Sequence, residues 1–204
     1  ATLALNAFPA ANAVTLEGGA LAINGAVSYT QQVTLVGGLT NTLRMAGNYA
    51  LLKGALTGTG DVLVTGAGLP GLMLTNSGHS FLGRVQIANG AFLRLIGSET
   101  LPDTAVVEVQ AGGNLRLDGG GRTETLAGLS GAGAVWIPTS SDDHALRIGA
   151  GDVSSTFDGM LGTPGQNHSI TLNKIGAGVF TLNGSNLYAG VTTIEAGSLG
   201  VTGL

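Results

Sequence analysis

The sequence predicts an all-β protein, a single-stranded parallel β-helix (β-solenoid) of roughly nine rungs. Three observations support this fold class. Glycine is abundant, at 36 of 204 residues, while charged residues make up only 10%. Short apolar or alternating segments recur along the whole chain between glycine turns. A looser phrase, a glycine turn followed by x-Leu-x-Leu, returns roughly every 20 to 25 residues, which is a suitable length for one rung of a solenoid.

The predicted strands are short and have one buried face. In Leu93-Arg94-Leu95 and Leu115-Arg116-Leu117, the leucines point to one side of the strand and the arginine points to the other. Such strands are predicted at residues 14–16, 21–23, 33–36, 42–45, 62–64, 72–74, 85–87, 92–95, 106–109, 115–117, 134–137, 145–148, 169–172, 179–182 and 191–194. Helix is expected to be nearly absent, because no window of about 11 residues shows helical apolar spacing.

The turns and the composition favour a solenoid over other all-β folds. Glycine pairs at 18–19, 37–38 and 112–113, and Asn-Gly at 89–90, separate the predicted strands. Glycine adopts positive φ without a steric clash, so it suits corners that the chain must turn repeatedly. Aromatic residues make up only 4% of the chain, which disfavours the aromatic core of a sandwich. The narrow interior of a β-helix instead admits stacked Leu, Val and Ile.

The charge pattern excludes one class of partner. The net charge is −4, and the 8 basic residues are scattered and never adjacent. No basic stripe is available to neutralise several phosphates, so nucleic acid binding is excluded. The chain has no cysteine, which excludes disulfides and thiolate metal sites. We expect no cofactor.

A longer phrase occurs twice. Residues 79–93 align with residues 186–199 at a constant offset, matching Phe81 with Tyr188, Gly83 with Gly190, Ile87 with Ile194 and Gly90 with Gly197. A Gly-Ala-Gly lies upstream of each copy, at 66–68 and at 176–178. The second copy is the more regular one, because extra residues separate the first copy from its Gly-Ala-Gly.

Residues 172–199 resemble the autotransporter-associated β-strand repeat found in passenger domains of bacterial type V secreted proteins. The positions that carry the resemblance are Lys174, Gly176, Gly178, Leu182, Gly184, Asn186, Tyr188, Gly190, Thr192, Ile194, Gly197 and Leu199. We therefore expect residues 1–204 to be a single β-helix segment, a fragment of a longer passenger. Within it, 61–95 and 172–199 are repeat copies and 1–60 match only weakly.

The resemblance implies a right-handed coil and a structural role, in which the repeat supports secretion and folding. It implies a secreted or cell-surface location at the outer membrane of a Gram-negative bacterium, reached through a C-terminal translocator barrel absent from this sequence. An adhesin-like or toxin-like stalk involved in virulence is the expected function. Host-cell surfaces, glycans or self-association, including an end-to-end oligomer, are the expected partners.

An enzymatic alternative rests on Asp142, Asp143 and His144, the densest polar cluster of the chain. Paired carboxylates beside an imidazole suit acid/base chemistry or a metal, as in a β-helical polysaccharide lyase or hydrolase with an acidic groove. A solvated surface loop explains the same residues, so we expect no catalytic or metal site. A pure glycan-binding module is a third hypothesis, but Trp136 and Tyr29 are too few and too separated in sequence to support it.

Overall fold

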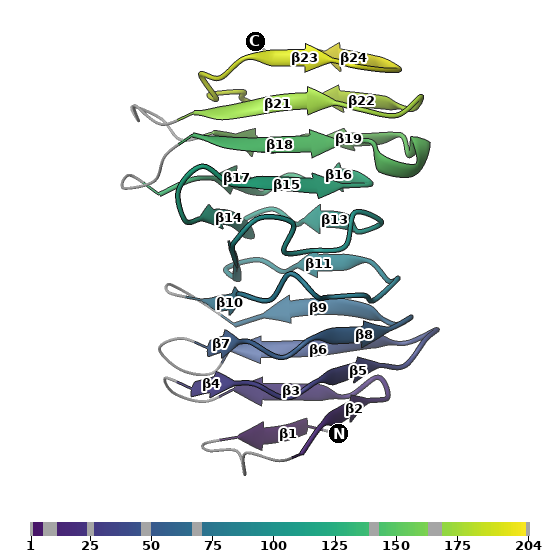
Figure 1. The fold of residues 1–204 in the computed structure, drawn as a ribbon, viewed down its shortest axis with the longest axis vertical. Coiled ribbons are helices and arrows are strands. Elements are labelled where there is room, and N and C mark those ends of the chain that lie inside the picture. The colour runs from purple at the N-terminus through teal and green to yellow at the C-terminus, as the bar shows by residue number, and fades with distance from the viewer. Residues whose placement is uncertain are drawn as a thin grey trace.

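The structure is a computed structural model that describes residues 2–5, 12–23, 27–45, 50–66, 71–138, 143–162 and 169–202. In these parts of the chain, short strands stack in parallel into about eight turns of a β-solenoid. The predicted fold class is therefore confirmed. The turns follow one another along the long axis of the molecule, from the N-terminus at one end to the C-terminus at the other (Figure 1).

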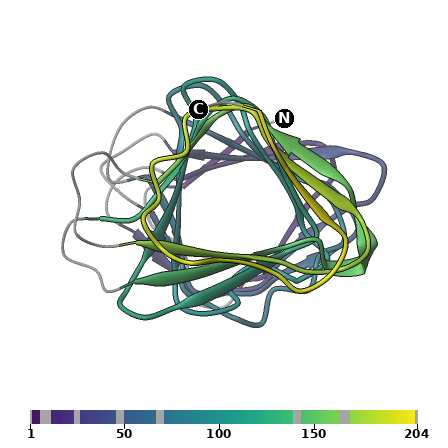
Figure 2. The same cartoon turned by 90° about the horizontal axis from the view of Figure 1, so that it is seen from above.

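The solenoid has three faces and a roughly triangular outline when seen along its axis (Figure 2). The first face is a seven-stranded sheet of β1 (Thr2–Leu5), β3 (Ala20–Ile23), β6 (Thr40–Met45), β9 (Asp61–Thr65), β11 (Val85–Ile87), β13 (Val106–Val109) and β16 (Gly128–Ser130). A bridge from Gly131 to Phe157 joins it to a three-stranded sheet of β19 (Ser155–Phe157), β22 (Val179–Leu182) and β24 (Ser198–Val201).

The second face is also a seven-stranded sheet. It contains β4 (Val27–Tyr29), β7 (Ala50–Leu52), β10 (Leu72–Leu74), β12 (Phe92–Ile96), β14 (Asn114–Asp118), β17 (Ala134–Trp136) and β20 (Met160–Leu161). The third face contains two sheets. The first holds β2 (Val14–Leu16), β5 (Val33–Leu35) and β8 (Leu56–Gly58), and the second holds β15 (Thr123–Leu126), β18 (His144–Ile148), β21 (Ile170–Lys174) and β23 (Thr192–Ile194).

Between its two sheets, the third face is continued by segments that form no strand. The backbone amides of Ser80 and Leu82 donate to the carbonyls of Leu56 and Gly58 at 2.9 and 3.0 Å, which extends the stack beyond β8. The amide of Glu99 donates to the carbonyl of Thr123 at 2.8 Å and so reaches β15. The side chains of these segments supply hydrogen bonds that a regular ladder would otherwise make.

The core is a set of apolar columns that run along the axis, because the register places inward residues directly above one another. On the second face one column contains Leu72, Leu93, Leu115, Val135 and Leu161, each 1% exposed or less. Burial of each such side chain contributes on the order of 1.5–3 kcal/mol. The alternation in x-Leu-Arg-Leu thus has the predicted meaning, with leucines inside and arginines outside.

Helix is nearly absent, as predicted. Among the described residues there is a single 3₁₀ turn, Ala150–Asp152. No helix in this part of the chain has the length and apolarity needed to cross a membrane.

Candidate functional site in the C-terminal repeat

The repeat residues form one complete turn and the start of the next. From β21 on the third face, the chain turns a corner at 175–178 into β22 on the first face. Residues 183–190 then cross the second face, where Asn186 forms a bridge to Leu161, and the chain returns to the third face in β23. In register, Lys174 lies between Ile148 of the turn before and Ile194 of the turn after.

Lys174 is the most unusual residue of this turn. It is the last residue of β21, points inward and is fully buried, in the line of apolar residues that includes Ile148. Its ammonium group donates hydrogen bonds to the backbone carbonyls of Ile175, Gly176 and Ala196 at 2.5, 2.8 and 3.2 Å. A buried charge is tolerated when its donors are satisfied. Because Ala196 belongs to the next corner, Lys174 ties two successive corners together.

Glycine makes this close stacking of corners feasible. Gly176 and Gly197 have φ of 67°, in the left-handed region where a Cβ is unfavourable. A Cβ on Gly176 would also lie 2.0 Å from the carbonyl oxygen of Gly149, one turn earlier. The other repeat glycines are in similar positions, since an added Cβ would come within 2.5 Å of a carbonyl oxygen at Gly178, Gly184 and Gly190.

Asn186 and Tyr188 serve local structure. The amide of Asn186 donates to the carbonyl of Gly184 at 2.9 Å. Its Oδ1 is buried and has no hydrogen-bond partner in the described parts of the chain. Tyr188 packs against the core, and its hydroxyl forms a 2.8 Å hydrogen bond with Thr192 Oγ1.

The remaining repeat positions are apolar or at the surface. Leu182 is 1% exposed, and Leu199 packs against the core while remaining partly exposed. Thr192 and Ile194 are exposed. The repeat therefore presents no converging set of reactive side chains.

The residues of the cluster at 142–144 do not lie together in the structure. Asp142 lies outside the described residues. Asp143 is exposed and its Oδ1 accepts a hydrogen bond from the amide of Ser169 at 2.7 Å. His144 is 2% exposed because it opens β18 with its side chain inward. Asp143 and His144 therefore point to opposite sides of the same wall.

Besides His144 and Lys174, two further buried titratable groups, His79 and Glu124, lie on the third face. Sequence reasoning gave neither of these two a role in the interior. His79 Nδ1 accepts a hydrogen bond from the amide of Leu56 at 2.8 Å, and burial lowers the pKa of His79 to about 4. Glu124 is 2% exposed, and burial raises its pKa to about 8. Its position in Thr123–Leu126, with the spacing Glu-x-Leu, was the available signal that it points inward.

These groups do not assemble a metal centre. Within the described ranges, no group of three or more His, Asp or Glu side chains is arranged to hold a metal ion. The acidic and imidazole groups instead satisfy backbone amides, so their observed chemistry is structural.

A solenoid of stacked parallel turns, with a buried lysine and close-packed glycines at its corners, belongs to the class of rod-like β-helical domains. A family model described as "passenger-associated-transport-repeat" matches residues 172–201. Together with the β-solenoid, this match fits an autotransporter passenger domain, in agreement with the resemblance noted in the sequence. No curated protein and no solved structure matches the chain.

Proposed function

We propose that this chain is a structural and interaction segment of an autotransporter passenger, an adhesin-like or toxin-like stalk outside the cell. Its C-terminal repeat supports folding and secretion of that stalk. The observation that carries the proposal is the position of Lys174 within the matched repeat, where its ammonium group joins the corners of two successive turns.

The physical argument concerns how a solenoid grows. A new turn must fix a corner before its strands gain their ladder, and corners expose backbone carbonyls. Lys174 offers a preplaced donor to the carbonyl of Ala196, so the turn containing β23 and β24 gains a charge-assisted hydrogen bond at its first corner. The repeat thereby favours orderly addition of the next turn.

The test is secretion of a Lys174→Met variant, displayed through a type V translocator in a Gram-negative host. Methionine keeps the length and apolar stem but removes the donor. We expect severalfold less folded protein at the surface, measured by protease protection, and a loss of about 2–4 kcal/mol in the free energy of unfolding of the purified chain.

Lys53→Met is the matched control, because Lys53 is the other lysine and is exposed at the surface. It should be secreted and should unfold like the unmodified chain. Equal secretion and equal stability of the two variants would remove the basis of the proposal.

The enzymatic alternative gains no support from the geometry. A lyase or hydrolase needs acid and base groups that face one bound substrate. Exposed Asp143 and buried His144 do not face a common space, so no second function is proposed on that cluster.

A further inference from the structure

The outer side of the second face differs from the outer side of the third face at β2, β5 and β8. On β2, β5 and β8 of the third face, the outward positions carry a column of threonines, Thr15, Thr34 and Thr57. On the second face, large apolar residues occupy partly exposed outward positions, at Leu51, Met73, Phe92, Trp136 and Met160. The solvent-exposed face of a sheet usually carries polar residues at these positions.

Two arginines interrupt this apolar surface. Arg94 and Arg116 are register partners on β12 and β14, and Trp136 of β17 is the next residue in that column. The Nε atoms of both arginines donate to Asp118, at 2.7 Å from Arg94 and 3.0 Å from Arg116. Two guanidinium groups against one carboxylate give this surface a local positive charge, on a chain whose net charge is −4.

Trp136 is held in one orientation by three neighbours. Its Nε1 donates to Oδ1 of Asn114 at 3.3 Å. The guanidinium of Arg116 lies 4.9 Å from the centre of the indole ring, and Phe92 meets the indole edge-on with ring centroids 6.5 Å apart. We call Phe92, Arg116 and Trp136 the aromatic platform.

The hydrogen-bonding capacity of Arg116 is incompletely used. Its Nε bonds to Asp118 and its Cζ lies over the ring of Trp136, but its terminal amino groups donate to no acceptor among the described residues. A guanidinium presents five N–H donors, and the terminal pair matches the geometry of a carboxylate. Arg116 can therefore receive an anionic group beside an aromatic ring.

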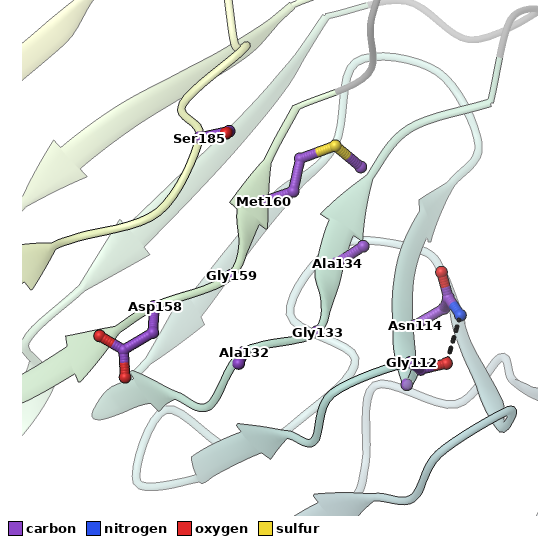
Figure 3. A pocket seen from close by; sticks show the side chains of 10 residues that line it. Gly112, Asn114, Ala132, Gly133, Ala134, Asp158, Gly159, Met160 and Ser185 are labelled. Atoms are coloured by element: carbon purple, nitrogen blue, oxygen red, sulfur yellow. Dashed lines mark hydrogen bonds between the residues drawn. The ribbon is translucent and has the colours of Figure 1, made fainter. Parts of the chain in front are cut away.

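A groove of about 340 Å³ adjoins the aromatic platform through Asn114. Figure 3 shows Gly133 and Ala134 between Asn114 on one side and Met160 on the other, with Asp158 at the far end from Asn114. Small side chains on β17 create the depression, because their register partners Asn114 and Met160 are larger. Its volume is at the lower end of the range for small-ligand sites.

The aromatic platform carries a positively charged group, whereas the groove next to it carries a negatively charged group. The guanidinium of Arg116 lies next to Trp136, whereas the carboxylate of Asp158, which accepts a hydrogen bond from Asn183 at 2.7 Å, lines the groove with Ser185. An extended ligand with a carboxylate at one end, hydroxyl donors at the other and an apolar ring face between them complements this arrangement.

We propose that the outer side of the second face is a binding site for a glycan containing uronic acid. The carboxylate of the sugar bonds the terminal amino groups of Arg116. An apolar face of a pyranose ring packs against Trp136 or Ala134, and hydroxyl groups donate to Asp158. The glycan would be the binding partner of the proposed stalk. This proposal rests on the proposed function only because it requires the chain to be displayed outside the cell.

The experiment is a fluorescence titration of the purified chain, since Trp136 is the only tryptophan and reports directly from the site. Hyaluronan tetrasaccharide is the probe, and chitotetraose is the neutral sugar of equal length. We expect a saturable change in Trp136 emission with the former. Binding of the neutral sugar should be at least about tenfold weaker, because it lacks the charge-assisted bond.

Arg116→Met should weaken binding of the acidic sugar by about tenfold or more. Arg147→Met is the matched control, because Arg147 is on β18 of the third face and pairs with Glu195. Arg116→Lys keeps the charge without the planar donors and should bind with intermediate strength. Thermal melts of each variant verify folding, and calorimetry of the unmodified chain measures affinity independently of Trp136 emission.

The proposal is overturned if neither emission nor calorimetry detects binding at the highest soluble concentration of the acidic sugar. Equal affinities of Arg116→Met and Arg147→Met would also overturn it. It is also overturned if emission depends on protein concentration and sedimentation shows dimers, because the face would then be covered by a second copy. These measurements use the folded chain alone. A failure here leaves the secretion test of Lys174 unaffected, and a failure of that test leaves this binding site to be judged separately.

Discussion

Glu99 and Glu124 hold the same two chain segments together from opposite directions. The carboxyl group of Glu124 accepts hydrogen bonds from the amides of Thr100 and Leu101 at 2.8 and 2.7 Å. The carboxylate of Glu99 accepts from the amide and the hydroxyl of Thr125 at 2.9 and 3.0 Å. This carboxylate clasp joins residues 99–101 to β15, where the third face has no strand between its two sheets. Glu99 has φ of 47°, which the clasp helps to maintain.

The clasp predicts a loss of stability at alkaline pH. The pKa of Glu124 is raised to about 8, mainly by burial; the backbone amides of Leu101 and Thr100 oppose this rise and the nearby carboxylates of Glu99 and Asp103 add to it. A raised pKa in the folded state means that the stability is present below the unfolded value and is lost as pH rises through the folded value. The free energy of unfolding should fall by a few kcal/mol between about pH 5 and pH 9.

Glu124→Gln should flatten this alkaline decline, because glutamine cannot ionise. Urea unfolding at several pH values measures the effect, with Glu17→Gln as the control at an exposed glutamate. If both variants decline as the unmodified chain does, the clasp is not the source of the pH dependence.

The burial of His79 predicts that the free energy of unfolding also falls at acid pH. Its folded-state pKa is lowered to about 4 by burial, so its contribution is present above the unfolded value near 6.5 and is lost as pH falls through 4. Protonation would also remove the acceptor that Nδ1 offers to the amide of Leu56. The loss should reach a few kcal/mol below pH 4.

His79→Asn should shift the midpoint of acid unfolding to lower pH, since an amide oxygen accepts the same bond without titrating. Circular dichroism from pH 7 to pH 3 measures the midpoint. An unshifted midpoint would show that another group causes the loss of stability at acid pH. Together the two groups predict greatest stability near pH 5 to 6.5.

The effect of a Gly→Ala substitution on stability should depend strongly on whether the glycine lies at a close-packed corner. A Cβ on Gly184 would lie 2.0 Å from the carbonyl oxygen of Gly159, so Gly184→Ala should lower the free energy of unfolding by more than about 2 kcal/mol. On Gly200 of β24, a Cβ would meet only the side chain of Thr181, at 3.4 Å or more. Gly200→Ala should be nearly neutral, and equal melting temperatures of the two variants would contradict the close-packed corner.

Asn41 predicts a large cost for loss of one buried amide. It is fully buried, accepts a hydrogen bond from the amide of Gly18 at 2.9 Å, and donates to the carbonyls of Val36, Leu39 and Asp61 at 3.3 Å. Asn41→Ala removes these four hydrogen bonds from a buried position and should cost about 3 kcal/mol in urea unfolding. Asn173→Ala, on the outward side of β21, is the control and should change stability little.

Local patterns predicted the strands well, because alternation and glycine corners are properties of neighbouring residues. Val14–Leu16 and Asn114–Asp118, for example, form strands where x-apolar alternation predicts them. The contacts between turns were harder to predict. Connections of unequal length, such as the one from Ile96 to Val106, interrupt the period, so register between turns is not readable from spacing alone.

Register is what creates the unexpected sites. Arg116 and Trp136 are 4.9 Å from guanidinium to ring because they are partners in one column, although many residues separate them in sequence. The clasp depends in the same way on Glu124 lying over Thr100. For Lys174, the resemblance identified the residue as part of the repeat, but its inward direction and its bonds to successive corners required the structure.

Because strands pair with their counterparts in the adjoining turns, rod length is independent of cross-section. Duplicating or deleting one regular turn of roughly 20 to 25 residues changes the length by about 4.8 Å and leaves the strands on either side able to pair in parallel. Gene duplication can therefore adjust the separation between the two ends in small, equal increments. The strand spacing thus sets the smallest step by which the length of the molecule can change.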